Sequence, residues 1–411
     1  MHRKIKINTF LIFVFSFFMI VGQYFDSVVS QVMALISIGY TIIYFKKRII
    51  RVNGTEFGKY LLLFALLICF GILNSYYRFN EDIFFNFRRV LVIIASILLY
   101  FVGADSISKG KITSVELRKI IIAIGVLALM LFVLQYVLYD QIQFLDVHTG
   151  IRKGSTRIRF YYNCILLILP LFLCFDIFLK KRNLYRYICI IFAIGVMFEV
   201  YIIQNYRMST ISVVITIACG YFLYSRSYKK LIVFIAIVIG SLIFVYTSNE
   251  LREIWQSFVN GTDTFAVRAQ ALTYYSEKLK DSLLFGYGTV FPAEILSTAA
   301  LAAGYGQWIQ LGDNGILGFA YCYGILGILW FICFWIVLYK KGIYLFKSSK
   351  TRIMYGLLFP LYMTIVLRSE ILWYWNNGFV VFVLYLLLLE SDIYNLKNLK
   401  NESKLARFKT G

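Results

Sequence analysis

Runs of apolar residues long enough to cross a lipid bilayer recur from one end of this chain to the other. About 30 Å of hydrocarbon requires roughly 20 apolar residues in a helix, and 60% of the 411 residues are hydrophobic. Little water-soluble sequence remains between the runs. The sequence therefore predicts an all-α polytopic membrane protein that forms one integral membrane domain over residues 1–411, with no soluble catalytic domain attached.

The apolar runs divide into about twelve predicted transmembrane helices. They are Thr9–Phe25, Val28–Phe45, Lys59–Leu73, Val90–Gly103, Ile120–Tyr139, Phe160–Leu179, Tyr187–Ile203, Met208–Tyr224, Leu231–Tyr246, Gly315–Tyr339, Ile353–Leu367 and Ile371–Leu389. Several are shorter than a full span, and we expect them to borrow flanking residues or to thin the bilayer locally. The first run follows a basic N-terminal end, as in a signal peptide. No small-residue cleavage site follows Phe25, so we predict an uncleaved first helix.

The distribution of Lys and Arg indicates the orientation of the chain. If the N-terminus is cytoplasmic and the helices alternate, about two thirds of the 42 basic residues fall on cytoplasmic segments, as the positive-inside rule requires. We therefore predict that both termini are cytoplasmic. The net charge of +21 then reflects orientation and contact with anionic membrane lipids. Nucleic-acid binding is not expected, because the basic residues are spread over many loops and build no single patch.

Cysteine and histidine usage argues against metal and disulfide chemistry. All seven cysteines lie inside predicted spans, where they behave as small apolar residues. His2 and His148 are the only histidines, so a zinc site built from histidine is not expected. The chain also lacks an Asp-x-Asp metal motif. We predict a protein without metal or cofactor.

The longest predicted external connection, Thr247–Asn314, has structure of its own. Within it, Asp263–Leu284 has the apolar spacing of a helix, and the run Phe285-Gly286-Tyr287-Gly288 ends that helix sharply. A second short helix is expected over Glu294–Ala303. A long ordered segment in a protein with otherwise tight loops usually carries function.

Several arginines lie on segments predicted to be external, where membrane proteins usually carry few basic residues. They are Arg157, Arg159, Arg207, Arg268 and Arg368. Guanidinium groups bind phosphate oxygens in a bidentate manner, so these cations suggest an anionic substrate at the outer face. The alternative is that they anchor the protein at lipid headgroups, and Arg368 can also pair with Glu370 in its own turn.

Two carboxylates are candidates for acid–base work. Glu199 lies eight residues before Arg207, two turns along the same helix face, and a carboxylate at that depth is expected to point into the bundle. It pairs with an arginine, positions a substrate hydroxyl, or makes a purely structural polar contact. Asp313 lies at the external end of a Gly-rich span and is placed to orient or deprotonate an acceptor hydroxyl, although helix capping explains Asp313 and Asn314 almost as well. Tyr287 belongs to a set of external aromatic residues that suit a saccharide substrate.

Three short motifs and the layout resemble the O-antigen ligase and polysaccharide polymerase superfamily of bacterial envelope proteins. The motifs are Gln204-Asn205-Tyr206-Arg207-Met208-Ser209 at a span boundary, Arg268 followed by Gly286-Tyr287-Gly288, and Asp313-Asn314-Gly315. The resemblance implies glycosyl transfer at the outer face of the bacterial cytoplasmic membrane, from undecaprenyl pyrophosphate, with the matched arginines binding pyrophosphate. Ligases usually carry a histidine where this chain has Asp313. We therefore expect a polymerase of capsular or exopolysaccharide repeat units.

The resulting hypothesis is a metal-independent membrane glycosyltransferase. Its predicted catalytic residues are Arg207, Arg268, Asp313 and Glu199, and its predicted substrate-binding residues are Arg157, Arg159, Arg368, Tyr287 and Asn314. The expected partners are an undecaprenyl-pyrophosphate-linked oligosaccharide, membrane lipids, a flippase and a chain-length regulator. The alternatives are ligase-type transfer to another acceptor, a flippase for lipid-linked oligosaccharide, and a non-catalytic envelope protein. The long external segment argues against a flippase, whose loops are usually short.

Overall fold

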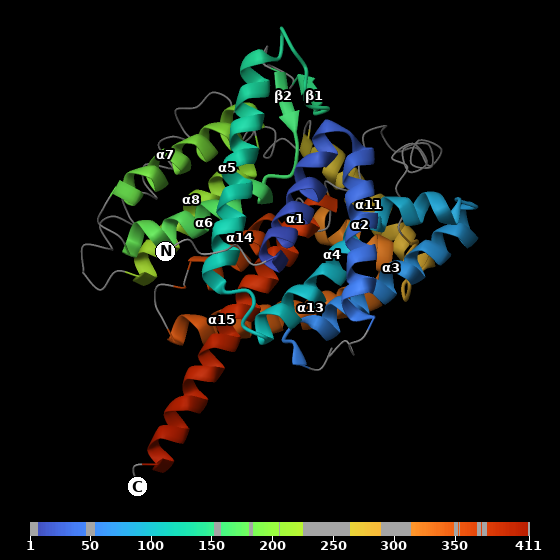
Figure 1. Ribbon diagram of the computed structural model, residues 1–411. Helices are drawn as coiled ribbons and strands as arrows, with labels where there is room; N and C mark the ends of the chain where they lie inside the picture. Colours follow the sequence, from blue (N-terminus) through green and yellow to red (C-terminus); the bar gives the residue numbers. More distant parts are fainter. Residues whose placement is uncertain are drawn as a thin grey trace.

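The computed structural model describes residues 7–46, 54–151, 158–180, 184–204, 206–224, 264–288, 314–348, 352, 354–367, 371 and 376–409. Within these residues the chain is helical apart from one two-stranded antiparallel hairpin. In Figure 1 the hairpin lies at the upper end of a helix bundle, and the C-terminal part of α15 (Asn376–Lys409) projects from the lower end. The all-α fold class predicted from the apolar runs is thus confirmed.

The described elements come in the following order along the chain. Before the hairpin come α1 (Ile7–Phe25), α2 (Ser27–Phe45), α3 (Gly58–Phe79), α4 (Ile83–Ser108) and α5 (Ser114–Leu138). The hairpin consists of β1 (His148–Ile151) and β2 (Ile158–Tyr161). The other described elements are α6 (Ile165–Lys180), α7 (Leu184–Phe198), the π-helix η2 (Glu199–Ile203), α8 (Arg207–Tyr224), α11 (Thr264–Asp281), α13 (Gly315–Ser348), the π-helix η5 (Met354–Leu358), α14 (Phe359–Val366) and α15.

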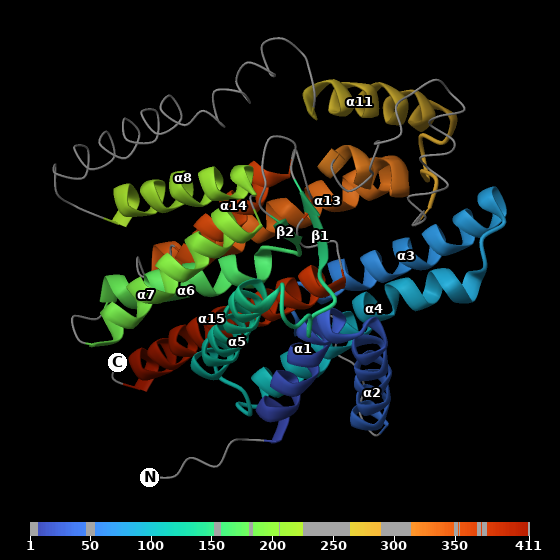
Figure 2. The same cartoon turned by 90° about the horizontal axis from the view of Figure 1, so that it is seen from above.

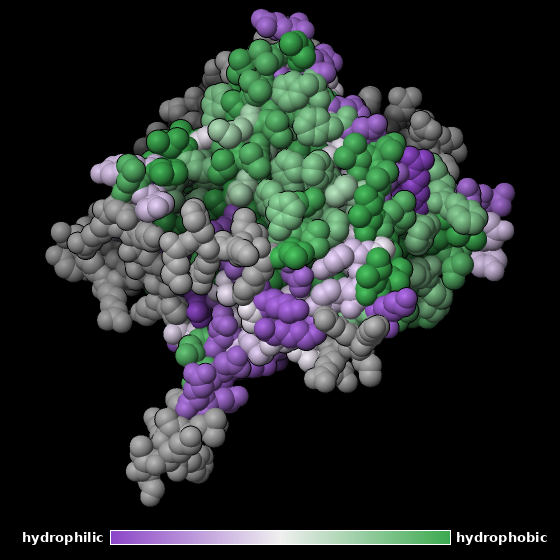
Figure 3. Space-filling model, in the orientation of Figure 1, coloured by the Kyte–Doolittle hydropathy of each residue, from purple (hydrophilic) through white to green (hydrophobic). Residues whose placement is uncertain are grey.

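The surface and the helix lengths are those of a membrane protein. Among the described residues, eight helices are long and apolar enough to cross a membrane, and three apolar helices are shorter. Large apolar side chains such as Leu35, Ile42 and Ile43 on α2 are exposed, which lipid accommodates. Figure 3 shows hydrophobic residues across the middle of one face, with hydrophilic residues at the hairpin and along the lower part. Predicted spans fall mainly on these helices, and Leu231–Tyr246 lies outside the described residues.

Polar residues at the helix starts explain the tight turns. Asp26 caps α2 by accepting a hydrogen bond from the Val28 backbone N–H at 2.8 Å, so α2 begins at Ser27, directly after the cap, while α1 ends at Phe25. Thr113 and Glu116 form a capping box at the start of α5. Such caps satisfy backbone donors that would otherwise be unpaired at a helix end.

The centre of the bundle is α15, which α1, α4, α5, α6 and α13 surround. Its residues from Phe379 to Leu389 are all buried, because the segment is apolar on every side and therefore suits a fully enclosed helix. On α4, Gly103 faces Leu387, and a Cβ there would lie 2.6 Å from a Leu387 methyl carbon. Small residues at such crossings allow close packing of membrane helices.

Two segments differ from the sequence prediction. The predicted span Phe160–Leu179 begins at Ile165, because Phe160 belongs to β2 and pairs with Thr149. The predicted span Ile371–Leu389 belongs to a longer helix, because α15 begins at Asn376 and continues to Lys409. The strands are too short for a two-residue alternation to stand out in sequence, and the polar end of α15 is rich in helix-forming Leu, Lys and Glu.

The helix α13 is broken at Gly324 (φ 62°), and the chain that follows α11 fills the break. The Tyr287 and Gly288 backbone N–H groups donate to the Tyr321 and Cys322 carbonyls at 2.7 and 2.8 Å, and the Ile325 N–H donates to the Leu283 carbonyl at 2.8 Å. Irregular backbone within a membrane domain persists only where protein groups satisfy it in this way. Figure 2 shows α11 alongside α13. The predicted helix and the glycine break after it are both confirmed.

The crossing of α13 and η5 gives a first prediction. A Cβ added to Gly342 would collide with the Gly356 carbonyl oxygen, whereas a Cβ added to Gly39 on α2 would meet nothing within 4 Å. Gly342→Ala should therefore lower stability by about 1–3 kcal/mol, and Gly39→Ala should leave it unchanged or raise it by about 0.5–1 kcal/mol. Thermal unfolding of the purified variants in detergent measures the difference. Equal midpoints for the two variants would contradict the close crossing.

A charged cluster ties the chain before α3 to α13 and α15. The Glu56 carboxylate pairs with Lys341 on α13 at 2.5 Å and with Lys397 on α15, and the Glu56 backbone N–H donates to Glu390 at 2.9 Å. Burial alone would raise the pKa of Glu56, but the two ammonium groups outweigh burial and hold that pKa below its ordinary value. A carboxylate with a lowered pKa stabilises the fold above its unfolded pKa, and this contribution is lost as pH falls through the folded pKa.

The second prediction follows from this pairing. Glu56→Gln should lower stability near neutral pH by about 1 kcal/mol, since the pairs are only partly buried, and the gap from wild type should close on acidification below the usual carboxyl range. Thermal unfolding across a pH series checks both parts. Glu402→Gln, a change at an exposed carboxylate on α15, is the control and should follow the wild-type curve throughout.

Candidate functional site

Glu199 is the predicted site residue whose position is most informative. It opens the π-helix η2 at the end of α7, and its side chain is fully buried. One carboxylate oxygen, Oε1, accepts a hydrogen bond from the Gln204 amide at 2.9 Å. The other, Oε2, has no hydrogen-bond partner among the described residues. The carboxylate therefore points into the bundle, as predicted, and retains an open acceptor position.

The turn after Glu199 connects it directly to Arg207. The Gln204 N–H donates to the Glu199 carbonyl at 2.9 Å, and the Tyr206 N–H donates to the Val200 carbonyl at 3.0 Å. The chain then enters α8, whose first residue is Arg207. The N-terminal end of a helix carries unpaired backbone N–H groups and a partial positive charge. This end of α8 thus lies one short turn from the buried carboxylate.

Polar side chains from three further elements lie near Glu199. The Tyr24 hydroxyl, at the end of α1, accepts hydrogen bonds from the Asn163 backbone N–H at 3.4 Å and from the Asn377 amide at the start of α15. Tyr24 also packs against Phe132 of α5 with ring centroids 5.0 Å apart, and η2, which Glu199 opens, packs against α5 as well. None of these partners was among the predicted site residues. Asn377 follows another asparagine at the start of an apolar run, which is the one sequence signal that was available.

Arg159 approaches the same region from the hairpin. It lies on β2, which packs against η2, and its guanidinium lies 3.9 Å from the centre of the Tyr161 ring. Its Nε is buried and has no hydrogen-bond partner among the described residues. Arg159 and Glu199 form no ion pair with each other. Each of these two predicted site residues therefore keeps hydrogen-bonding capacity for another group.

The start of α13 lies beside the end of α14. The Ile316 N–H donates to the Leu367 carbonyl at 3.1 Å, which brings the chain just after Asp313 next to the chain just before Arg368. Asn314 is buried at this point. On α14, the Tyr362 hydroxyl contacts the Ser209 hydroxyl of α8 at 2.5 Å. The helix α14 thus contacts both α8, which begins at Arg207, and α13, which follows Asp313.

Tyr287 lies in a separate aromatic cluster with Tyr274, Tyr275 and Tyr321. Its ring stacks on Tyr321 with centroids 4.7 Å apart and lies beneath the Arg78 guanidinium, also at 4.7 Å. Burial, and then the nearby Asp281 carboxylate, raise the pKa of Tyr287. These contacts hold the segment after α11 against α3 and α13, and sugar stacking by Tyr287 stays a prediction.

The remaining predicted site residues are only partly described. Arg157, Asp313 and Arg368 lie outside the described residues. Arg207 and Arg268 have their backbones on α8 and α11, but their side chains lie outside the described part. Their roles stay predictions.

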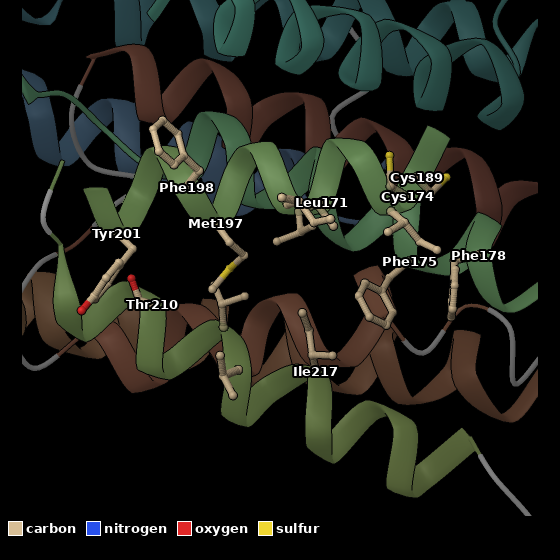
Figure 4. Close-up of a pocket in the computed structure, with 15 residues that line it drawn as sticks. Leu171, Cys174, Phe175, Phe178, Cys189, Met197, Phe198, Tyr201, Thr210 and Ile217 are labelled. Atoms are coloured by element: carbon tan, nitrogen blue, oxygen red, sulfur yellow. The ribbon is translucent and has the colours of Figure 1, made fainter. Parts of the chain in front are cut away.

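An apolar cavity of about 800 Å³ runs between α6, α7 and α8. Its lining includes Leu171, Phe175, Met197 and Ile217, and Figure 4 shows the Tyr201 hydroxyl and the Thr210 hydroxyl together at one end. That end is close to the site along the chain, because Phe198 and Tyr201 flank Glu199 in sequence and Thr210 lies one turn into α8, while Glu199 itself does not line the cavity. The cavity thus has a long apolar body and one polar end.

Glu199→Gln gives a third prediction, which separates a functional carboxylate from a structural one. A buried charge without a cation costs free energy, so its neutral isostere should keep the wild-type unfolding temperature or raise it. Tyr362→Phe, which removes a buried hydroxyl paired with Ser209, should instead cost about 1 kcal/mol. Thermal unfolding in detergent compares the two. A clear loss of stability in Glu199→Gln would indicate that the carboxylate serves the fold.

No family model matches this chain, and no curated protein matches it. The chain is an all-α polytopic membrane protein with a buried, half-satisfied carboxylate beside a helix N-terminus and an apolar cavity.

Proposed function

We propose that this chain is a polysaccharide polymerase of the O-antigen ligase and polymerase superfamily. It joins undecaprenyl-pyrophosphate-linked repeat units at the outer face of a bacterial cytoplasmic membrane. The observation that carries the proposal is the open Oε2 of Glu199, one turn from the start of α8 and beside the polar end of the apolar cavity. In this proposal the cavity binds the lipid of the substrate, the start of α8 binds its pyrophosphate, and Glu199 binds the attacking hydroxyl.

The cavity suits the lipid part of such a substrate. Its volume of about 800 Å³ and its lining of apolar side chains from α6, α7 and α8 match a branched hydrocarbon chain, which gains free energy from contact with apolar walls. Its polar end at Tyr201 and Thr210 suits the point where a hydrocarbon chain meets a charged headgroup. A substrate with an apolar tail and a polar head therefore fits a cavity that has an apolar body and one polar end.

Positive charge at the site suits the pyrophosphate part of the proposed substrate. The N-terminal end of α8 favours an anion, and Arg207 is the first residue of that helix. Arg159 on β2 adds a guanidinium with an unused buried Nε. A pyrophosphate leaving group requires stabilisation of developing negative charge more than it requires a proton, and guanidinium groups supply that. We assign Arg268 and Arg368 the same role.

The reaction assigned to this site is a displacement at an anomeric carbon. A hydroxyl oxygen of the acceptor repeat unit forms a bond to the anomeric carbon of the donor, and its proton passes to Glu199. The bond between that carbon and the pyrophosphate oxygen breaks, and the pyrophosphate leaves with the electron pair. Alignment of the two sugars in the site contributes part of the rate. Asp313 is the second candidate base.

The topology we propose has about twelve spans and both termini in the cytoplasm. In that orientation the hairpin, the start of α8 and the start of α13 are external. The projecting end of α15, with Lys397 and Lys400, is cytoplasmic, in line with the positive-inside rule. The opposite positions of the hairpin and the α15 end in Figure 1 support this assignment.

The fourth prediction tests the proposed function directly. In proteoliposomes supplied with lipid-linked repeat units, Arg207→Ala and Glu199→Gln should each slow chain elongation by about 10²–10³-fold, the usual cost of one electrostatic or acid–base group. Polymer length on a gel over time is the measurement. Lys111→Ala is the matched control, because Lys111 is exposed in the turn between α4 and α5, and it should elongate at the wild-type rate.

Other outcomes of the same assay point elsewhere. If Arg207→Ala and Glu199→Gln both elongate chains at the wild-type rate, then Arg207 does not stabilise the pyrophosphate and Glu199 is not the base. Movement of labelled lipid carrier across the bilayer without chain growth would favour a flippase, and transfer only to a different acceptor lipid would favour a ligase.

A further inference from the structure

Tyr24 has an unusual hydrogen-bonding state for a buried tyrosine. A phenolic hydroxyl has one proton to donate and lone pairs to accept with. Both groups that contact this hydroxyl are donors, the Asn163 backbone N–H and the Asn377 Nδ2. The Tyr24 hydroxyl is thus used as an acceptor twice, and its own proton has no acceptor among the described residues.

The orientation of the Asn377 amide is determined by its other contact. The Asn377 Oδ1 accepts a hydrogen bond from the Gly378 backbone N–H at 2.8 Å. With the oxygen occupied, the Nδ2 must be the atom that faces Tyr24. The ring of Tyr24 is held as well, because it packs edge-on against Phe132 at 5.0 Å and against Tyr162 at 5.9 Å. The direction of the unused proton is therefore set by packing.

The unused donor and an unused acceptor lie in one buried region. The Oε2 of Glu199 lacks a partner among the described residues. Glu199 opens η2, which packs against α5 and β2, and Tyr24 packs against Phe132 of α5 and against Tyr162, which follows β2. The two groups are not hydrogen-bonded to each other. A buried donor and a buried acceptor that stay unpaired each cost about 1–3 kcal/mol, so a group that satisfies both would be bound favourably.

The chemistry of the pair restricts what that group can be. An ammonium group only donates and leaves the Tyr24 proton unpaired. A phosphate or carbonyl oxygen only accepts and leaves Glu199 unpaired. An alcohol hydroxyl, like a water molecule, accepts one hydrogen bond and donates another, so it satisfies both at once.

We propose that Tyr24 and Glu199 together bind the attacking hydroxyl of the acceptor sugar, Tyr24 donating to its oxygen and Glu199 accepting its proton. Asn163 and Asn377 are positioning residues that act through Tyr24. This inference rests on the proposed function and adds the acceptor-binding residue to it. It also assigns the acceptor to the region where the ends of α1 and α7 meet the start of α15, with the donor lipid in the cavity between α6, α7 and α8.

The fifth prediction is that the Tyr24→Phe variant uses the acceptor less well but binds the donor normally. With lipid-linked repeat units as donor and a repeat-unit oligosaccharide freed from its lipid as acceptor, Tyr24→Phe should lower kcat/KM for the acceptor by about tenfold, the upper range for one hydrogen bond. The KM for the donor should not change. Tyr385→Phe is the control. Tyr385 is also a buried tyrosine, on α15, and its hydroxyl has no hydrogen-bond partner among the described residues, so this variant should match wild type.

A second variant guards against simple misfolding. Asn377→Ala removes one of the two donors that orient Tyr24, so it should weaken acceptor use in the same direction. The double variant Tyr24→Phe/Asn377→Ala should be no slower toward the acceptor than Tyr24→Phe alone, because the two residues act through one hydroxyl. Additive losses would contradict the positioning role.

The outcomes separate this inference from the function on which it rests. If wild-type protein elongates chains and Tyr24→Phe has an unchanged kcat/KM for the acceptor, the acceptor assignment is wrong while the polymerase proposal stands. The same conclusion follows if Tyr24→Phe changes only the donor KM, or if Tyr385→Phe loses as much activity. If the wild-type protein joins no repeat units, both proposals are overturned.

Discussion

The constraint on which this structure depends is the cost of an unpaired polar group where no water is available. Inside a bilayer each backbone N–H and C=O must find a protein partner. The break of α13 at Gly324 would leave such groups open. The chain around Leu283 and Tyr287 satisfies them with backbone hydrogen bonds of 2.7–2.8 Å. The helix α11 is thereby joined to α13, and the glycines at 286 and 288 are required because both have positive φ.

The same constraint distinguishes Glu199 from Asp392, another buried carboxylate. Asp392 on α15 pairs with Arg118 at 2.9 Å, lies 3.6 Å from Arg352, and accepts a hydrogen bond from the Tyr355 hydroxyl. Its charge is compensated, as expected for a structural group. Among the described residues, Glu199 has only an amide on one oxygen. A buried carboxylate that the described part of the chain leaves uncompensated and half-satisfied is one that a bound substrate would pair with.

The π-helix η2 connects Glu199 to residues that line the cavity, and the proposed function depends on this connection. The π-helix η2 ends α7 with a wider turn, which brings Glu199 into the bundle while Phe198 and Tyr201 still line the cavity. π-Helical turns are frequent at functional positions. One short stretch of chain therefore connects an apolar space, a buried base and the start of α8, so that a lipid tail and a reacting sugar are served by neighbouring residues.

The sequence by itself determined the fold class, the positions of most helices, the helix α11 with its glycine end, and the burial of Glu199. These follow from apolar run length, helical spacing, the conformational demands of glycine and the cost of charge in lipid, all of which are local properties. Only the tertiary structure revealed the hairpin, the break in α13 filled by a distant segment, and the grouping of Tyr24, Asn163 and Asn377 around one hydroxyl. Those features depend on which helices pack together, and residues more than a hundred positions apart leave no periodic signal in a single sequence.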